Sequence, residues 1–127
     1  MSPLAKPAVW VDSPPLAPEG PAIDLDHLER MTLGERELER EVLMLFAQQS
    51  ADLLARLAKL PREGASLAHT LKGSARGIGA FAVAEAADNL EQRLRRGLPI
   101  TAEVAVLAHA IGAAQAAISE RLQGLRR

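Results

Sequence analysis

The sequence of 127 residues contains no cysteine and no tyrosine, and aromatic residues make up only 2% of it. Without cysteine the protein cannot form disulfide bonds or thiolate metal sites, and it is compatible with a reducing cytoplasm. The chain does contain 48% hydrophobic and 24% charged residues. A chain of this length and composition can bury the core of one folded domain.

An excess of charge of one sign is also missing, since 15 lysines and arginines are balanced by 16 aspartates and glutamates. No basic run occurs, so nucleic acid is not an expected partner. No apolar stretch approaches the roughly eighteen residues of a membrane span, and the first residues lack the pattern of a signal peptide. We therefore expect a cytoplasmic protein that does not bind membranes.

Nucleotide-binding loops of the types GxxxxGK(S/T) and GxGxxG are absent, and no acidic magnesium cluster lies near His69 in the sequence. A kinase with its own nucleotide site is therefore excluded. The Glu-x-x-His pairs that bind metal ions in helical bundles are absent too. A metal site would require His27, His69 and His109 to converge from three different helices, so we expect neither a cofactor nor a metal ion.

Proline divides the chain into two parts. Six of the eight prolines lie in residues 1–22, where they prevent a regular helix and predict a proline-rich arm. The arm carries the single tryptophan, Trp10, within the apolar run AVWV, which either docks on the domain or forms a loose apolar patch. Residues 23–127 are predicted to form the folded domain.

Hydrophobic residues in that domain recur at helical spacing, and no strand pattern appears. Alanine, leucine, glutamate and arginine dominate, and all four are good helix formers. The spacing predicts a short helix over 25–31, a long one over 35–60, one that carries His69, one over 83–96 that Gly97 ends, and a last one after the turn at 98–100, with Thr101 as its N-cap. The sequence therefore predicts an all-α protein, an antiparallel four-helix bundle with a short extra N-terminal helix.

One polar residue interrupts the apolar face predicted for the long helix. That face consists of Leu38, Val42, Leu45, Gln49, Leu53 and Leu60. A buried amide without a hydrogen-bond partner costs roughly 1–3 kcal/mol. Gln49 is therefore expected either to bond the ring of His69, or to lie at the solvated edge of the face.

The segment from Ala68 to Ala80, AHTLKGSARGIGA, places a histidine on an exposed helical face. At roughly 100° per residue, His69 points about 160° away from the apolar stripe of this helix. That stripe consists of Leu67, Leu71, Ala75 and Ile78. Lys72 and Arg76 follow on the outward side with His69, and Gly73 leaves the imidazole unshielded by any side chain. The segment therefore combines one nucleophile, two cations and open space.

The other two histidines have ordinary surroundings. His27 lies among alternating charges in DLDHLER, and His109 lies among small apolar residues in VLAHAIGA. Neither is followed by a lysine and a glycine, so neither is interpreted as functional. Arg93, Arg95 and Arg96 lie near a helix end, where charges are usually only solvated.

The sequence leaves two possible starting positions for the helix that carries His69. If Ser66 is its N-cap, His69 lies in the first turn, where the helix dipole favours added negative charge. If Pro61 is the first helical residue, His69 lies in mid-helix and lacks that support.

The motif HTLKGSARGIG resembles that of histidine-containing phosphotransfer (HPt) domains, which carry phosphoryl groups between receiver domains in phosphorelays. The segments IDLDHLERM, EREVLMLFAQQSADLLARL and AEAADNLEQRLRRG are similar as well, so the resemblance covers residues 23–97. Two features depart from the family. The span 60–66 is shorter than usual, and Arg76 stands where the family more often has a small or polar residue.

Position by position, the resemblance implies roles for individual residues. His69 is the phosphoryl acceptor, Lys72 is the phosphate partner, and Gln49 matches a glutamine that hydrogen-bonds the histidine ring. Four residues that follow the histidine in the same segment are expected to form the face on which a receiver docks: Gly73, Ser74, Arg76 and Gly77.

The resemblance implies a phosphorelay intermediate rather than an enzyme with a nucleotide site. Neutral Nε2 of His69 would attack the aspartyl-phosphate of a receiver, whose own magnesium ion stabilises the transferring charge. Lys72, together with Arg76, would neutralise phosphoryl oxygens and disfavour the imidazolium. The expected partners are response-regulator receiver domains and a hybrid histidine kinase. The alternative is a helical adaptor that binds such domains without accepting phosphate.

Overall fold

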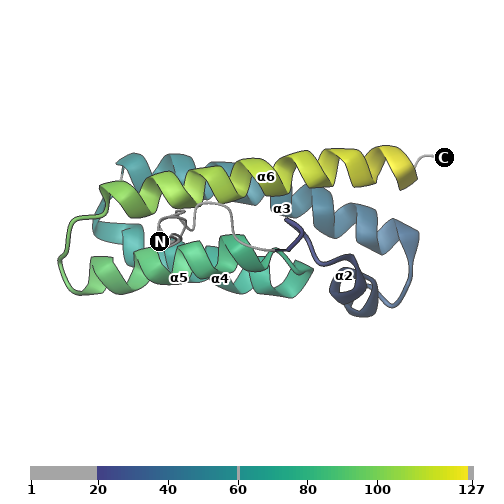
Figure 1. The fold of residues 1–127 in the computed structure, drawn as a ribbon, viewed down its shortest axis with the longest axis horizontal. Coiled ribbons are helices and arrows are strands. Elements are labelled where there is room, and N and C mark those ends of the chain that lie inside the picture. Colours follow the sequence, from purple (N-terminus) through teal and green to yellow (C-terminus); the bar gives the residue numbers. More distant parts are fainter. Residues whose placement is uncertain (1–19, 60, 126–127) are drawn as a thin grey trace, which may run out of the picture.

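The structure is a computed structural model that describes residues 20–59 and 61–125. This part of the chain contains helices and no strand (Figure 1). Its elements are α2 (Leu25–Met31), α3 (Arg36–Lys59), a 3-10 turn η1 (Pro61–Glu63), α4 (Gly64–Ile78), α5 (Phe81–Arg95) and α6 (Thr101–Leu125). The predicted all-α bundle with a short extra N-terminal helix is confirmed. The proline-rich arm, Trp10 and Leu60 lie outside the described residues, apart from 20–22.

The long helices differ in length, and this difference makes room for α2. Helices α3 and α6 have 24 and 25 residues, whereas α4 and α5 have 15 each. In Figure 1, α4 and α5 run along one part of the α3–α6 pair, and α2 lies beside the end at which α4 stops. Among the described residues, α4 packs mainly against α5, also against α3, and at its ends against α2 and η1, and the rest of its surface is left uncovered by them.

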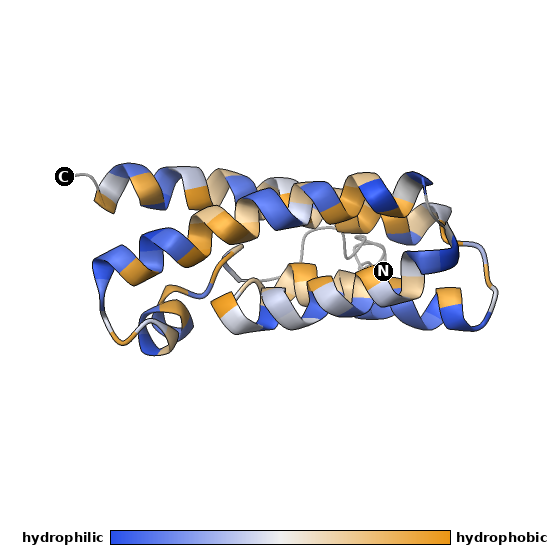
Figure 2. Cartoon of the chain, turned by 180° about the vertical axis from the view of Figure 1, so that it is seen from behind, coloured by the Kyte–Doolittle hydropathy of each residue, from blue (hydrophilic) through white to orange (hydrophobic). Residues whose placement is uncertain are grey.

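Hydrophobic and hydrophilic residues alternate along the long helices at the helical period (Figure 2). On α4 the predicted stripe of Leu67, Leu71, Ala75 and Ile78 is buried, as is the α5 stripe from Val83 through Ala87 to Leu90. Several residues at the α4–α5 contact are alanines, which allow the two helix backbones to approach closely. This close packing brings side chains at the edges of α4 and α5 within bonding distance.

The buried face of α3 differs from the prediction. Leu45 is 63% exposed, and the residues that point into the core are Leu43, Phe46, Ser50, Leu53 and Leu57. The face includes polar side chains that have partners: Glu39 forms an ion pair with Arg121 of α6, and the Ser50 hydroxyl donates to the carbonyl of Ala47. Because these residues look like surface residues in the sequence, the predicted face was rotated toward the wrong side of the helix.

Helical backbone begins with the 3-10 turn at Pro61–Glu63 and continues directly into α4 at Gly64. The start after Ser66 is therefore wrong, and the alternative with Pro61 as the first helical residue is the closer one, although the α-helix proper begins at Gly64. A Cβ atom at Gly64 would lie 3.0 Å from a methyl group of Leu94, so a glycine allows α4 to start close against α5. Glu63 occupies the N-cap position without a side-chain hydrogen bond. His69 therefore lies in the second turn of α4, beyond the first-turn N–H groups at which the dipole acts most strongly.

The C-terminal end of α4 is fixed against the segment that precedes α2. Gly79 ends the helix with φ of 87°, a left-handed conformation, and its carbonyl accepts a 2.9 Å hydrogen bond from the backbone N–H of Asp24. A Cβ atom at Gly79 would lie 2.8 Å from the carbonyl oxygen of Asp24. Only glycine satisfies both the conformation and the close approach.

The expectation that no stretch is long and apolar enough to span a membrane is wrong for one helix, α6. Within the described residues it is the one helix that passes this test by length and composition, and 28% of its most apolar 18-residue window is buried. Core helices of soluble proteins have the same composition, and α6 packs against α3 and α5. Alanines on its exposed side account for much of its apolar character. The finding is weak evidence for a membrane span.

Candidate functional site

His69 lies on the solvent-facing side of α4, as predicted, with 63% of its side chain exposed. Gly73 and Arg76 are exposed on the same helix, and Ser74 and Gly77 are partly exposed. A Cβ atom built on Gly73 or on Gly77 would meet no other atom of the described residues within 4 Å. The helix therefore presents its histidine on an open surface.

The imidazole ring is held by a carboxylate on the neighbouring helix. Nδ1 of His69 lies 3.1 Å from Oε2 and 3.3 Å from Oε1 of Glu91 on α5. Because a carboxylate can only accept hydrogen bonds, this contact requires a proton on Nδ1. In the neutral ring the lone pair is then on Nε2, the nitrogen farther from Glu91.

Gln49 does not make the predicted hydrogen bond with His69. Among the described residues the partner of Nδ1 is Glu91, and Gln49 is partly exposed on α3. The buried face of α3 runs through Phe46, Ser50 and Leu53, which places Gln49 at the edge of that face. The solvated-edge alternative considered for Gln49 is therefore the one that fits.

Glu91 is a nearly buried carboxylate that accepts hydrogen bonds from three side chains. Besides Nδ1 of His69, its oxygens lie 2.9 Å from Nζ of Lys72 and 2.9 Å from Nη2 of Arg95. Burial alone would raise the pKa of the Glu91 carboxyl, but the hydrogen bonds from Lys72, Arg95 and His69 outweigh it and lower the pKa to about 2. Glu91 is therefore negatively charged at neutral pH.

Lys72 turns toward α5 rather than outward beside His69. Its side chain is 15% exposed, and Nζ lies 3.1 Å from Oδ1 of Asp88 as well as 2.9 Å from Glu91. The hydrogen bonds that Lys72 donates to Glu91 and Asp88 raise its pKa, so this amine is firmly protonated. The expectation of two outward cations is thus corrected to one, Arg76.

Asp88 completes the group of charged side chains beside His69. Its second oxygen, Oδ2, accepts a 3.1 Å hydrogen bond from the amide of Gln92. The hydrogen bond from Lys72 lowers the pKa of Asp88 in spite of partial burial. We call His69, Lys72, Asp88, Glu91 and Arg95 the histidine cluster.

Sequence reasoning missed the two carboxylates of the histidine cluster. Asp88, Glu91 and Arg95 follow one another at spacings of three and four, which places them on one side of α5. Glu91 also directly follows Leu90 of the buried stripe, so its position in the sequence places an acidic residue next to the core. That signal identifies Glu91 as a buried charge in need of partners, although it does not name them.

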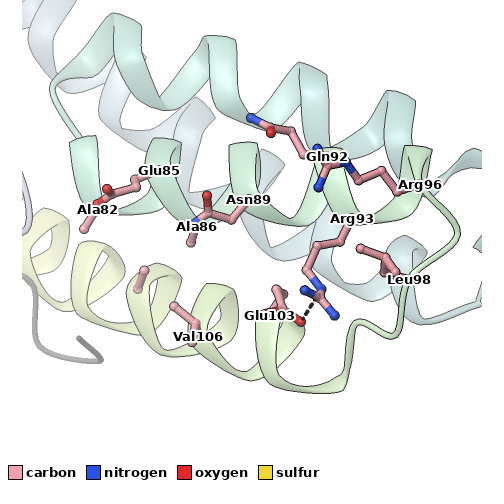
Figure 3. A pocket seen from close by; sticks show the side chains of 11 residues that line it. Ala82, Glu85, Ala86, Asn89, Gln92, Arg93, Arg96, Leu98, Glu103 and Val106 are labelled. Carbon is pink, nitrogen blue, oxygen red and sulfur yellow. Dashed lines mark ion pairs between the residues drawn. The ribbon is translucent and has the colours of Figure 1, made fainter. Parts of the chain in front are cut away.

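Two of the three arginines near the end of α5, Arg93 and Arg95, are not merely solvated, whereas Arg96 is exposed. Arg95 belongs to the histidine cluster, and Arg93 lies 3.2 Å from Glu103 and donates to the carbonyl of Pro99. Figure 3 shows the Arg93–Glu103 pair in a hollow of about 430 Å³ between α5 and α6. The side chains that line the hollow include Glu85, Asn89, Arg93, Arg96, Glu103 and Val106. No residue of the histidine cluster lines it, so it is separate from the site.

The remaining histidines lie apart from this site. The ring of His27 on α2 packs edge-on against Phe81, with 5.2 Å between ring centroids, and His109 is exposed on α6. Among residues 20–59 and 61–125, no group of three or more histidine, aspartate or glutamate side chains is arranged to hold a metal ion.

Comparison with protein families agrees with this geometry. The family model described as Hpt domain matches residues 41–126, which is about two thirds of the chain. The chain belongs to the Hpt domain family. The match includes α6, which lies beyond the residues 23–97 that the sequence resemblance covers, and it begins after α2. Comparison with curated proteins and with solved structures finds no significant match.

Membership in the Hpt family establishes the general role of the protein. Hpt domains take part in phosphotransfer within phosphorelays and two-component signalling, and they are carriers rather than enzymes with nucleotide sites. They interact with receiver domains and histidine kinases. The family match concerns the domain as a whole and not the roles of individual residues.

Proposed function

We propose that this Hpt domain accepts a phosphoryl group on Nε2 of His69 from the aspartyl-phosphate of one receiver domain and passes it to another. The observation that carries this proposal is the contact between Nδ1 of an exposed histidine ring and the nearly buried Glu91 carboxylate. The contact fixes the orientation of the ring and keeps the proton on Nδ1. The lone pair of Nε2 is then available to react at the exposed side of the ring.

The transfer itself exchanges one bond to phosphorus for another. The Nε2 lone pair forms a bond to phosphorus while the bond between phosphorus and the aspartyl oxygen breaks, which returns the receiver's aspartate as a carboxylate. The ring gains positive charge as the new bond forms, and the Glu91 carboxylate at Nδ1 stabilises it. The reverse reaction delivers the group to the next receiver.

The docking face would centre on Gly73, one turn beyond His69. The space around Gly73 is open, and Ser74 and Gly77 continue a surface of small residues along α4. A receiver must bring its aspartate within bonding distance of Nε2, and small residues beside the histidine permit that approach. Arg76 is exposed there and supplies a positive charge for an acidic receiver site.

This role implies the partners, the cellular location and the source of the metal ion that we propose. The partners are response-regulator receivers and a hybrid histidine kinase in the cytoplasm, and the magnesium ion is supplied by the receiver rather than by this chain. Hpt domain proteins are typically soluble. The balanced charge of the chain favours neither nucleic acid nor an anionic membrane as a partner.

The competing function is an adaptor that holds a receiver without accepting phosphate. To separate the two, the receivers of the source organism are phosphorylated and mixed in turn with the wild type, His69→Gln and His109→Gln. We expect at least one receiver to transfer label to the wild type and to His109→Gln, with none reaching His69→Gln. Receivers that bind all three proteins without transferring label would support the adaptor instead.

A further inference from the structure

Lys72 is the cation closest in sequence to His69 on α4, yet its ammonium group is bound to two carboxylates of α5. Nζ lies 2.9 Å from Oε1 of Glu91 and 3.1 Å from Oδ1 of Asp88. Two of the three N–H donors of Nζ are thus engaged by carboxylates, which hold the ammonium group toward α5. A phosphoryl group on Nε2 would compete with these carboxylates for the ammonium group.

The two carboxylates differ in how readily they release the lysine. Glu91 is 8% exposed and is bound by His69 and Arg95 as well, so separating Lys72 from it disturbs a buried network. Asp88 is 30% exposed, and water can replace the lysine at its oxygens while Gln92 keeps its own hydrogen bond. The Asp88 contact is therefore the one that is lost first.

We propose that Asp88 withdraws Lys72 from His69 in the unphosphorylated domain and thereby limits the lifetime of the phosphohistidine. When a phosphoryl group is attached to Nε2, its oxygens compete with Asp88 for the ammonium group, while Glu91 retains Lys72 in both states. Asp88 is thus a positioning residue that acts through Lys72. This inference rests on the proposed phosphorylation of His69.

The geometry of α4 permits this exchange. Lys72 follows His69 by three positions, so the two side chains are neighbours on the helix surface. The four-carbon stem of lysine is flexible, and its ammonium group can rotate from one acceptor to another without movement of the backbone. The phosphoryl group carries more negative charge than one carboxylate, which favours the exchange.

The lifetime is measured without a receiver, by loading the protein with phosphoramidate and following the phosphohistidine signal by ³¹P NMR. In the loss reaction, water forms a bond to phosphorus as the bond to Nε2 breaks, and inorganic phosphate leaves. For Asp88→Asn we expect a lifetime about two to five times longer than that of the wild type, the range that corresponds to a partly exposed ion pair. Glu85→Gln, an exposed acidic residue one turn earlier on α5, is the matched control and should leave the lifetime unchanged.

Repeating the Asp88→Asn change in a Lys72→Ala protein distinguishes two explanations. Asp88 either acts through Lys72 or simply repels the phosphoryl group. Lys72→Ala alone should shorten the lifetime, and adding Asp88→Asn to it should bring no gain, because no lysine remains to be released. An equal gain in both backgrounds, or an unchanged lifetime in Asp88→Asn, overturns the inference while leaving His69 as the acceptor. If phosphoramidate still phosphorylates His69→Gln, and the phosphoryl group of the wild type is not on His69, the proposed function is overturned as well.

Discussion

His69 and Glu91 are 22 positions apart in the chain, and Nδ1 of the one lies 3.1 Å from Oε2 of the other. The contact depends on the close packing of α4 on α5, for which Gly64, Ala68 and Ala87 leave room. Anything that separates these helices also releases the histidine ring. The reactivity of an exposed residue is therefore coupled to the packing of the core beneath it.

Replacing His69 with glutamine should abolish phosphoryl uptake and leave the fold intact. The side chain is mostly exposed and contributes little to packing, so the change in stability should be less than about 1 kcal/mol. Thermal melting and phosphotransfer are measured on the same sample. Uptake of label by this variant at any other residue would refute the assignment of the acceptor.

Replacing Glu91 with glutamine should change how stability depends on pH. The pKa of Glu91 is lowered from 4.5 to about 2 in the folded protein, so its ionised form stabilises the fold above pH 4.5. That contribution, on the order of 3 kcal/mol at most, is lost as the pH falls from 4.5 to about 2. Urea denaturation at a series of pH values should show the wild type and Glu91→Gln converging over that range.

The control for this comparison is Glu85→Gln, which removes a charge from an exposed position of the same helix. Stability curves of the wild type and Glu91→Gln that stay parallel from pH 6 to pH 2 would show that the Glu91 carboxylate does not have the partners described here.

Replacing Gly73 with glutamine should move stability and function in opposite directions. Glycine inside a helix costs roughly 1 kcal/mol relative to good helix formers, and the space around Gly73 is open, so the variant should melt at a higher temperature. The added side chain should obstruct the receiver and weaken both binding and transfer.

Gly112→Gln is the matched control, because Gly112 is an exposed glycine within α6 that also has open space around it. It should gain similar stability while keeping wild-type transfer. If Gly73→Gln transfers phosphate at the wild-type rate, the receiver docks on another face.

Replacing Gly79 with alanine should destabilise the domain more than the same change at Gly97. Both glycines have positive φ, 87° and 68°, and a left-handed conformation costs an alanine roughly 1–2 kcal/mol. A Cβ at Gly79 would in addition lie 2.8 Å from the backbone of Asp24, whereas one at Gly97 meets nothing within 4 Å. Equal losses in urea denaturation would mean that the chain before α2 is not fixed against the end of α4.

Helical periodicity was sufficient to predict the order of the helices and the exposure of His69. It failed on α3, because buried polar residues such as Glu39 and Ser50 have partners that the sequence does not reveal. The same error produced the wrong partner for the histidine ring. On the predicted face Gln49 was a buried amide in need of a partner, whereas on the actual face it lies at the edge.

The partner of His69 is set by the distance and register between two helices, which periodicity within one helix does not contain. Asp88 and Glu91 could be recognised as acidic residues on one side of α5, but their positions beside Lys72 depend on how α4 packs there. Similarly, the alanines of α6 have the composition of a buried or membrane helix, and only the fold shows which of them face solvent.

The most direct test of the account is a long-range ¹H–¹⁵N NMR spectrum of the histidine rings before and after phosphorylation by a receiver. The account predicts a His69 ring with the proton on Nδ1 before transfer and the phosphoryl group on Nε2 afterwards, with His27 and His109 unchanged. A phosphoryl group on Nδ1 of His69, or on either of the other two histidines, would contradict it.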